Sequence, residues 1–266
     1  MKAFPWSKVL HLKVCLGTLS DFVDAICLWA DGAGGAGGGA ELPAAEGRYI
    51  CVAPVATCME SFWNDRFRRI CDEADFVVPD GIPIVWALRR LGYTEQQRVS
   101  GPDLMLRLCA EAERRRIPIA LYGGTGSGLE RLQENLLRQF PALEIAYAYS
   151  PPLRPAGEPA PASELAAIRE SGARLLFVGT GCPKQEMWMA RHKAELPLVM
   201  LGVGAAFLFH SGEVRRAPQW MQRSGLEWLF RLSQEPKRLF KRYGRTNFAF
   251  LWHTRLLSGR QLRKYI

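Results

Sequence analysis

An aspartate directly follows an apolar segment in the sequence ADFVVPDGIPIVWALRR. Residues 76–78 are typical of a buried strand, and Gly81 and Pro83 then turn the chain into an expected helix at residues 84–91. The carboxyl ends of parallel strands line the ligand crevice in open α/β sheets. Asp80 is therefore a candidate general base, which a transfer to a sugar hydroxyl requires because the nucleophile loses its proton. Taken alone, a helix cap or a turn is the commoner role of such an aspartate.

A glycine-rich turn stands between an expected strand and an expected helix in IPIALYGGTGSGLERLQ. Gly123, Gly124, Gly126 and Gly128 would let backbone N–H groups and a helix N-terminus approach a pyrophosphate closely. The spacing is not G-x-G-x-x-G, and no acidic residue ends the next strand as a dinucleotide site expects. The turn therefore favours a nucleoside diphosphate over NAD.

A second such turn occurs in LLFVGTGCPKQEMWMARH. Its candidate substrate contacts are Gly179, Gly181, Pro183, Lys184, Gln185 and Glu186. Lys184 can meet a phosphate, and Gln185 can both donate to and accept from sugar or base groups. The alternatives are a solvated lysine and, for Glu186, a charge that complements the helix dipole.

The segment RVSGPD offers a cation, Arg98, and a carboxylate in the first turn of a helix, Asp103, with Gly101 between them. Arg98 can balance the charge of a departing diphosphate, a task that a divalent metal ion performs in other enzymes. A surface ion pair is an equally good interpretation of Arg98. The chain has no D-x-D triplet and its four histidines lack ligand spacing, so we expect neither a metal nor another cofactor.

These candidates need a sheet that places the strand ends together. From residue 48 onward, short apolar runs alternate with helical patterns, which predicts an α/β fold with a mainly parallel, doubly wound sheet and helices on both faces. The expected strands are 10–16, 49–54, 76–78, 117–122, 144–149, 175–178 and 198–203. The expected helices are 20–30, 62–73, 84–91, 102–116, 128–140, 162–171 and 184–195. Residues 31–47 are interpreted as a flexible linker, and 150–161 as an irregular loop.

The charge is concentrated at the C-terminal end. The chain of 266 residues has a net charge of +9, yet residues 214–266 hold 13 Lys+Arg against two acidic residues, a net of +11. We therefore expect an α/β core at 1–213 and a basic, aromatic-rich helical appendage at 214–266. Such a segment suits an anionic membrane surface, with nucleic acid or simple solvation as alternatives. The candidate membrane contacts are Arg231, Lys237, Arg238, Lys241, Arg242 and Arg245.

Two further patterns bear on the compartment. The seven cysteines are an odd number without C-x-x-C spacing, which is typical of reduced, buried thiols. Neither a standard export signal nor an apolar run of the roughly 20 residues that a spanning helix needs is present. We expect a cytoplasmic protein, peripheral on the inner face of the cell membrane.

Taken together, the motifs resemble the WecG/TagA/CpsF glycosyltransferase family. The matching text is ADFVVPDGIPIVWALR, RVSGPDLM, LYGGTGSG, VGTGCPKQEMWM and GVGAAFLFHSGEVRRAPQWMQRSGLEWLFRLSQEPKRLFKRY. It adds Gly81, Gly101, Asp103 and Gly204 to the candidate substrate contacts. The resemblance implies a Rossmann-like, inverting, metal-independent transferase that uses a UDP-sugar donor and a polyprenyl-diphosphate-linked sugar acceptor. It places the family's base on Asp80, its donor-contacting arginine on Arg98 and its glutamine on Gln185. It also implies that the basic appendage places the enzyme on the membrane and completes the active site.

The chain departs from the family's pattern at two places. The family commonly has T-x-N after its first core strand, where this chain has Val52, Ala53 and Pro54, and it commonly has an aspartate where this chain has Leu208. We therefore expect a changed sugar specificity, away from the N-acetylmannosamine usual in the family and towards the sugars of exopolysaccharide pathways. The rival hypotheses are a catalytically silent, membrane-docked nucleotide-binding scaffold, a nucleotide-binding oxidoreductase and a nucleic-acid binder. No nucleic-acid partner is expected.

Overall fold

A computed structural model describes residues 4–32 and 47–256 of the chain. The chain forms two compact units. Unit 1 consists of Met1–Thr18, Val52–Ser100 and Val214–Ile266, and unit 2 consists of Leu19–Cys51 and Gly101–Glu213. Residues from 214 onward thus belong to the same unit as the segment that contains Asp80 and Arg98.

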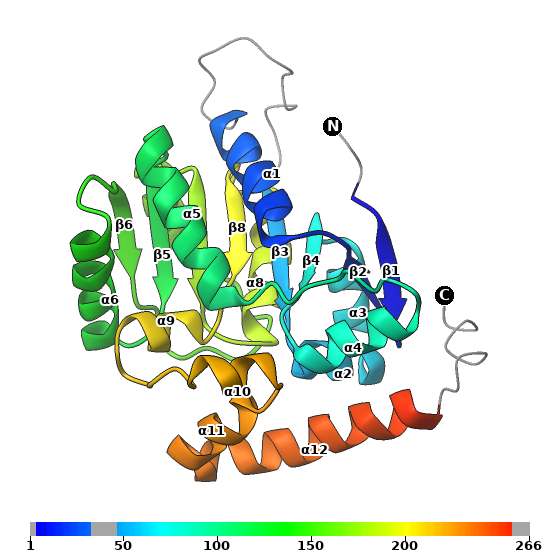
Figure 1. The fold of residues 1–266 in the computed structure, drawn as a ribbon. Coiled ribbons are helices and arrows are strands. Elements are labelled where there is room, and N and C mark those ends of the chain that lie inside the picture. Colours follow the sequence, from blue (N-terminus) through cyan, green and yellow to red (C-terminus); the bar gives the residue numbers. More distant parts are fainter. Residues whose placement is uncertain (1–3, 33–46, 257–266) are drawn as a thin grey trace. The chain divides into compact units, whose positions relative to one another are not determined.

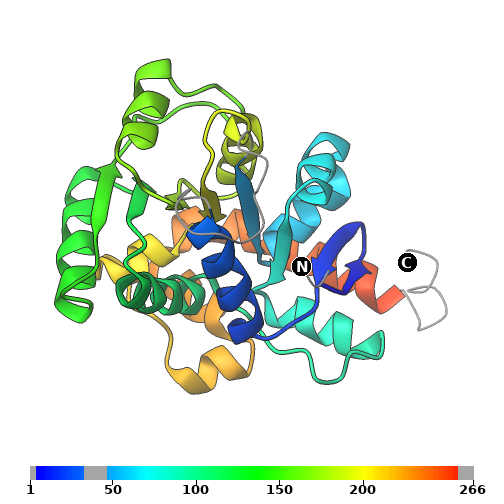
Figure 2. The same ribbon diagram turned by 90° about the horizontal axis from the view of Figure 1, so that it is seen from above.

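Unit 2 carries most of the parallel sheet. Its strands are β3 (Arg48–Ala53, whose last two residues belong to unit 1), β5 (Ile119–Gly123), β6 (Ile145–Tyr149), β7 (Leu175–Gly179) and β8 (Val199–Gly202). Its helices are α1 (Leu19–Gly32), α5 (Gly101–Arg115), α6 (Gly126–Gln139), α7 (Ala162–Glu170), α8 (Lys184–His192) and α9 (Ala206–His210). In Figure 2, α1 and α5 lie on one face of these strands and α7 and α8 on the other.

The strand order of the six-stranded sheet is β4-β3-β8-β7-β5-β6, and the pairs β3–β8, β8–β7, β7–β5 and β5–β6 are parallel (Figure 1). All residues of β5 and β8 are buried, as expected of strands covered on both faces. The edge strand β6 is half-buried throughout. The predicted α/β fold with a mainly parallel sheet and helices on both faces is confirmed.

Unit 1 combines a hairpin with helices and one strand of the large sheet. Its strands are β1 (Trp6–Val9), β2 (Leu12–Cys15) and β4 (Phe76–Pro79). Its helices are α2 (Val55–Trp63), α3 (Asp65–Asp72), α4 (Ile82–Arg90), α10 (Gln219–Arg223), α11 (Glu227–Gln234) and α12 (Pro236–Leu256).

The long helix α12 packs on α2 through one face. It buries Leu239 and Phe250, and the ring of Phe62 of α2 lies tilted against the ring of His253, with the ring centroids 4.5 Å apart. The guanidinium of Arg245 lies 4.4 Å from the ring centre of Trp63, within reach of a cation–π attraction. Packing on α2 therefore holds the helical C-terminal segment within unit 1.

The predicted helix at 62–73 is wrong at its start. Asn64 is extended, and its side-chain oxygen accepts hydrogen bonds of 3.1 Å from the backbone N–H groups of Arg66 and Phe67. An asparagine in this position caps a new helix, so α2 ends and α3 begins here. Of α2, only the last two residues were predicted to be helical.

The predicted strand at 10–16 is confirmed as β2, which is the second strand of a hairpin whose first strand, β1, was not predicted. Leu10 has a positive φ of 55° and reverses the chain between β1 and β2, which pair antiparallel. The predicted linker at 31–47 is also corrected at its start, because Asp31 and Gly32 are the last residues of α1. Residues 33–46 of that linker lie outside the described residues. The predicted loop at 150–161 is confirmed.

Candidate active site

Asp80 follows the last residue of β4 and precedes Gly81, the N-cap residue of α4. The backbone N–H of Asp80 donates to the carbonyl of Ala53 at the end of β3, 3.2 Å away. Among the described residues, the hydrogen bonds to the Asp80 carboxylate come from Arg98 and not from the first turn of α4, so Asp80 does not cap that helix. The predicted position of Asp80 at a strand end is therefore confirmed, and its carboxylate is available for another role.

Arg98 lies beside Asp80 because its own segment runs along β4. The N–H of Val99 donates to the carbonyl of Pro79 over 2.9 Å. Nε and Nη2 of Arg98 both donate to Oδ1 of Asp80, over 3.0 and 2.8 Å, and Nε also contacts the Asp80 carbonyl. Among the residues that the structure describes, none donates to Oδ2 of Asp80. One carboxylate oxygen is thus held by Arg98, and the other accepts no hydrogen bond from a described residue.

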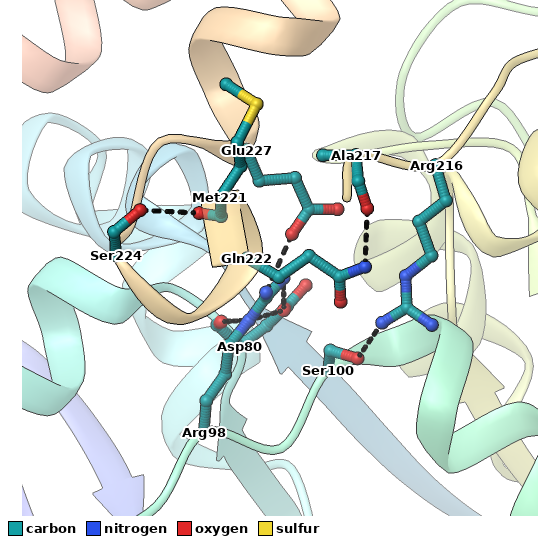
Figure 3. A network of polar contacts seen from close by, with 9 residues as sticks. All are labelled: Asp80, Arg98, Ser100, Arg216, Ala217, Met221, Gln222, Ser224 and Glu227. Carbon is teal, nitrogen blue, oxygen red and sulfur yellow. Dashed lines mark hydrogen bonds and ion pairs between the residues drawn. The ribbon is translucent and has the colours of Figure 1, made fainter. Parts of the chain in front are cut away.

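Glu227, the first residue of α11, completes a three-residue charge cluster. Nη1 of Arg98 donates to Oε2 of Glu227 over 2.7 Å, and Figure 3 shows the guanidinium between the two carboxylates. The side chains of Asp80, Arg98 and Glu227 are 17%, 19% and 13% exposed. Burial alone would lower the pKa of Arg98, but the two carboxylates outweigh it and raise this pKa above its usual value. Arg98 therefore stays charged.

Glu227 was not among the site residues predicted from the sequence. One signal was present, because Glu227 and Glu235 are the only acidic residues in a segment with 13 Lys+Arg. Glu235 pairs locally with Arg231 on the same turn of helix, whereas Glu227 reaches Arg98. The pattern of charges in the sequence does not indicate which of the two glutamates pairs with Arg98.

The chain just before α11 is also held by polar contacts (Figure 3). Arg216 donates to the hydroxyl of Ser100 over 3.2 Å, and the amide of Gln222 donates to the carbonyl of Ala217 over 2.7 Å. Ser100 follows Arg98 by two residues. The segment that carries Glu227 is therefore attached to the Arg98 segment at a second point.

The other candidate residues belong to unit 2. In the turn between β5 and α6, a Cβ on Gly123 would lie 2.7 Å from the carbonyl carbon of Gly179, so the two strand ends approach too closely for a side chain. Thr125 caps α6 by accepting from the N–H of Gly128 over 3.1 Å, and Gly126 is the first helical residue. The turn joins a strand to a helix N-terminus as predicted, and Gly124 has a positive φ of 75°. The binding of a phosphate by this turn stays a prediction.

In the turn between β7 and α8, the side chain of Gln185 points inward. It is 3% exposed, its Oε1 accepts from the N–H of Gly181 over 3.2 Å, and its amide donates to Glu186 over 3.1 Å. A Cβ on Gly204 would lie 3.3 Å from the same Oε1. Gln185 therefore braces this turn and the chain that follows β8.

Lys184, Pro183, Gly101 and Asp103 lie at helix starts. Nζ of Lys184 donates to the carbonyl of Arg154 over 2.7 Å, and Pro183 is the N-cap residue of α8. Gly101 and Asp103 lie in the first turn of α5, where Gly101 is buried. These predicted contacts with substrate stay predictions.

Within residues 4–32 and 47–256, no three His, Cys, Asp or Glu side chains group as metal ligands would. The metal independence of the reaction stays a prediction. In the same part of the chain, no helix has both the length and the apolar character to cross a bilayer.

Several side chains of α12 face solvent. Lys237, Lys241 and Arg245 are exposed, and so are apolar residues on the same helix: Phe240, Phe248, Leu251 and Trp252. Arg231, on α11, is half-buried. The side chains of Arg238 and Arg242 lie outside the described residues. The helix thus presents cations together with aromatic residues, and its contact with a membrane stays a prediction.

The residues at which the chain departs from the family pattern differ in how deeply they are buried. Val52 is 3% exposed and Ala53 is buried, while Pro54 and Leu208 are partly exposed. A side chain at position 52 is therefore buried, whereas side chains at positions 54 and 208 reach the surface.

Two comparisons with known proteins complete the description. The sequence profile of a family described as "Glycosyl transferase WecG/TagA/CpsF family" matches residues 39–264. A relative from Bacillus spizizenii is 32% identical over 195 residues, which cover 73% of this chain and 74% of that protein. That relative is named N-acetylglucosaminyldiphosphoundecaprenol N-acetyl-beta-D-mannosaminyltransferase.

Proposed function

Because the chain belongs to the WecG/TagA/CpsF family of glycosyltransferases, we propose that it transfers a sugar from a UDP-sugar to a polyprenyl-diphosphate-linked saccharide. The name of the Bacillus spizizenii relative supports a lipid-linked acceptor. We further propose that the reaction inverts the anomeric carbon, needs no metal ion and serves the synthesis of a cell-surface polysaccharide or exopolysaccharide. The sugar is a hexose or an N-acetylhexosamine.

The two carboxylate oxygens of Asp80 have different surroundings, and this difference supports the catalytic part of the proposal. Arg98 holds Oδ1, and Oδ2 accepts from none of the described residues. A carboxylate fixed in this way can accept a proton without changing its orientation.

In the proposed reaction, Oδ2 of Asp80 removes the proton of the acceptor hydroxyl. The oxygen then attacks the anomeric carbon from the face opposite UDP, and the bond to the diphosphate breaks with its electron pair on UDP. The configuration inverts because bond formation and bond cleavage occur on opposite faces. Two of the five N–H groups of Arg98 make no bond to Asp80 or Glu227, and we propose that they stabilise the leaving diphosphate.

We propose that unit 2 binds the donor. The turn at Gly123, Gly124 and Gly126 and the turn from Gly179 to Glu186 each present backbone N–H groups at the start of a helix, where the helix dipole favours an anion. Gln185 supports this role through the turn that it braces.

We also propose that the protein is peripheral on the inner face of the cell membrane. The support is the exposed face of α12, where Phe240 and Phe248 are 72% and 79% exposed beside Lys237 and Lys241. Aromatic rings at a bilayer interface bury apolar surface while the lysines meet anionic headgroups. We propose that the protein does not bind nucleic acid.

The test is transfer from a panel of radiolabelled UDP-sugars, UDP-N-acetylmannosamine and UDP-glucose included, onto a short polyprenyl-diphosphate N-acetylglucosamine. Asp80→Asn should reduce turnover by at least about 100-fold, a typical contribution of a general base, and leave UDP binding by calorimetry unchanged. Asp65→Asn replaces an exposed aspartate of the same unit and should retain turnover. EDTA should not affect the rate.

Retained turnover in Asp80→Asn would remove Asp80 from the role of base. UDP binding by the wild type without transfer from any donor would favour the silent scaffold, which the departures at Val52 and Pro54 also support.

A further inference from the structure

Glu227 joins the C-terminal helices to the side chain that holds the proposed base. Arg98 follows Asp80 by 18 residues, whereas Glu227 lies 129 residues beyond Arg98. All three side chains are at least four-fifths buried, which makes the cluster more than a solvated surface pair. Its geometry therefore depends on where the start of α11 is held.

The turn between α10 and α11 is held close to the chain that follows Asp80. Gly225 has a φ of +76°, and a Cβ on it would lie 3.0 Å from Cγ2 of Ile82. Ile82 is the first residue of α4, two residues after Asp80. This close approach places Glu227, two residues after Gly225, where it can reach Arg98 (Figure 3).

The way in which Arg98 bonds to Asp80 indicates what Glu227 does. An arginine and a carboxylate commonly pair side by side, with two N–H groups on two different oxygens. Here Nε and Nη2 both donate to Oδ1, while Nη1 donates to Glu227 over 2.7 Å. Without Glu227, the guanidinium could move to take both oxygens of Asp80, and Oδ2 would no longer be available for a proton.

We propose that Glu227 is a positioning residue for the transfer reaction. By holding Nη1 of Arg98, it keeps the guanidinium on Oδ1 of Asp80 and leaves Oδ2 for the proton of the acceptor hydroxyl. The inference rests on the proposed function of Asp80 and adds a contribution from the C-terminal helices to the alignment of the base.

The test compares Glu227→Ala and Glu227→Gln with wild type in the full-length protein. For Glu227→Ala we expect kcat to fall about 100-fold, the effect of misplacing a reacting group by roughly 1 Å. KM for the UDP-sugar and UDP affinity should not change. Glu227→Gln should recover part of the loss, because the amide oxygen can still accept from Nη1.

The matched control is Gln234→Ala, at the other end of α11. Gln234 bonds to the backbone of Arg215 at 3.1 and 3.0 Å and does not touch Arg98, so its replacement loosens α11 without moving the cluster. This control should keep the wild-type kcat. In the Asp80→Asn background, Glu227→Ala should cause no further loss, since both changes remove the same function.

Wild-type kcat in Glu227→Ala would overturn the inference, and so would an equal loss in Gln234→Ala, which would indicate a purely structural role. If the alanine variant does not fold, the glutamine variant provides the test. A Glu227→Gln protein whose side chain no longer bonds to Arg98, yet which has the wild-type kcat, would overturn the inference. In each of these outcomes the proposed function of Asp80 would still hold, because wild type would transfer sugar and Asp80→Asn would not. A wild-type protein that transfers no sugar would overturn the proposed function and this inference with it.

Discussion

Glu213 brings a carboxylate to the first turn of α6, where its Oε2 would lie 2.6 Å from a Cβ placed on Gly128. Its Oε1 accepts from the hydroxyl of Thr125 and from Arg131, over 3.1 Å in each case. The N-terminus of a helix favours a negative charge, so this carboxylate is well placed electrostatically. It also stands at the turn where we propose that the diphosphate of the donor binds.

Replacing Glu213 by Gln should therefore strengthen UDP binding. Removing one like charge about 4 Å from a phosphate is worth about 1 kcal/mol in water, or about fivefold in the dissociation constant. Calorimetry at low salt measures this gain, which should shrink in about 1 M salt because of screening. Glu111→Gln, which alters an ion pair on α5, is the control. If wild type and Glu213→Gln bind UDP with equal affinity, the diphosphate does not bind at this turn.

Replacing Gly179 by Ala should destabilise the protein. The added Cβ would lie 2.5 Å from the ring of Phe207, and overpacking of this kind typically costs about 1–3 kcal/mol. Urea denaturation gives the change in unfolding free energy. Gly126→Ala serves as the control because its Cβ meets nothing within 4 Å. Similar stability of the two variants would mean that Phe207 moves aside without cost.

Glu164 should make the stability of the protein depend on pH. It accepts from the Tyr122 hydroxyl over 2.9 Å and pairs with Arg154. Burial by itself would raise the pKa of Glu164, but the hydrogen bonds from Arg154 and Tyr122 outweigh it and lower this pKa below the ordinary 4.5. The stabilisation is therefore fully present above pH 4.5 and is lost as the pH falls through the lower folded value.

The corresponding variant is Glu164→Gln, which should cost on the order of 1.5–3 kcal/mol near pH 7, as expected for hydrogen bonds to a charged group. Chemical denaturation at pH 7 and at successively lower pH should show the difference from wild type shrinking below pH 4.5. Glu170→Gln, at the exposed end of the same helix, should show no such trend. If the difference in unfolding free energy between wild type and Glu164→Gln stayed constant across this pH range, the lowered pKa of Glu164 would be contradicted.

Lys237 and Lys241 should contribute to membrane binding. Each lysine near an anionic surface is worth about 1 kcal/mol, so the double change to Gln should weaken binding to phosphatidylserine-containing vesicles by roughly 30-fold. Vesicle sedimentation at about 0.05 and 0.5 M salt measures this loss and its screening. The double change of Arg66 and Arg69 to Gln removes two exposed cations from α3 and should have little effect. An equal loss in both variants would argue against α12 as the contact.

The sequence alone determined which segments form most of the strands of the large sheet and that Asp80 directly follows one of them. The apolar runs that became β3, β4, β5, β7 and β8 follow from burial on both faces, which leaves a local pattern in the sequence. Asp80 stands at a strand end because a turn signal, Gly81 and Pro83, comes directly after an apolar run. The backbone form of the two glycine-rich turns was equally visible, since only a few residue types permit such conformations.

Only the tertiary structure decided which partners these residues have. The pairing of Arg98 with Glu227 joins residues 129 positions apart, and no local pattern distinguishes Glu227 from Glu235. In the same way, the structure shows that Gln185 accepts from the N–H of Gly181, while its predicted contact with substrate stays a prediction. Sequence periodicity reports which side of an element is buried, whereas a side-chain contact depends on where distant segments pack. That packing minimises the free energy of the whole chain and has no local signal.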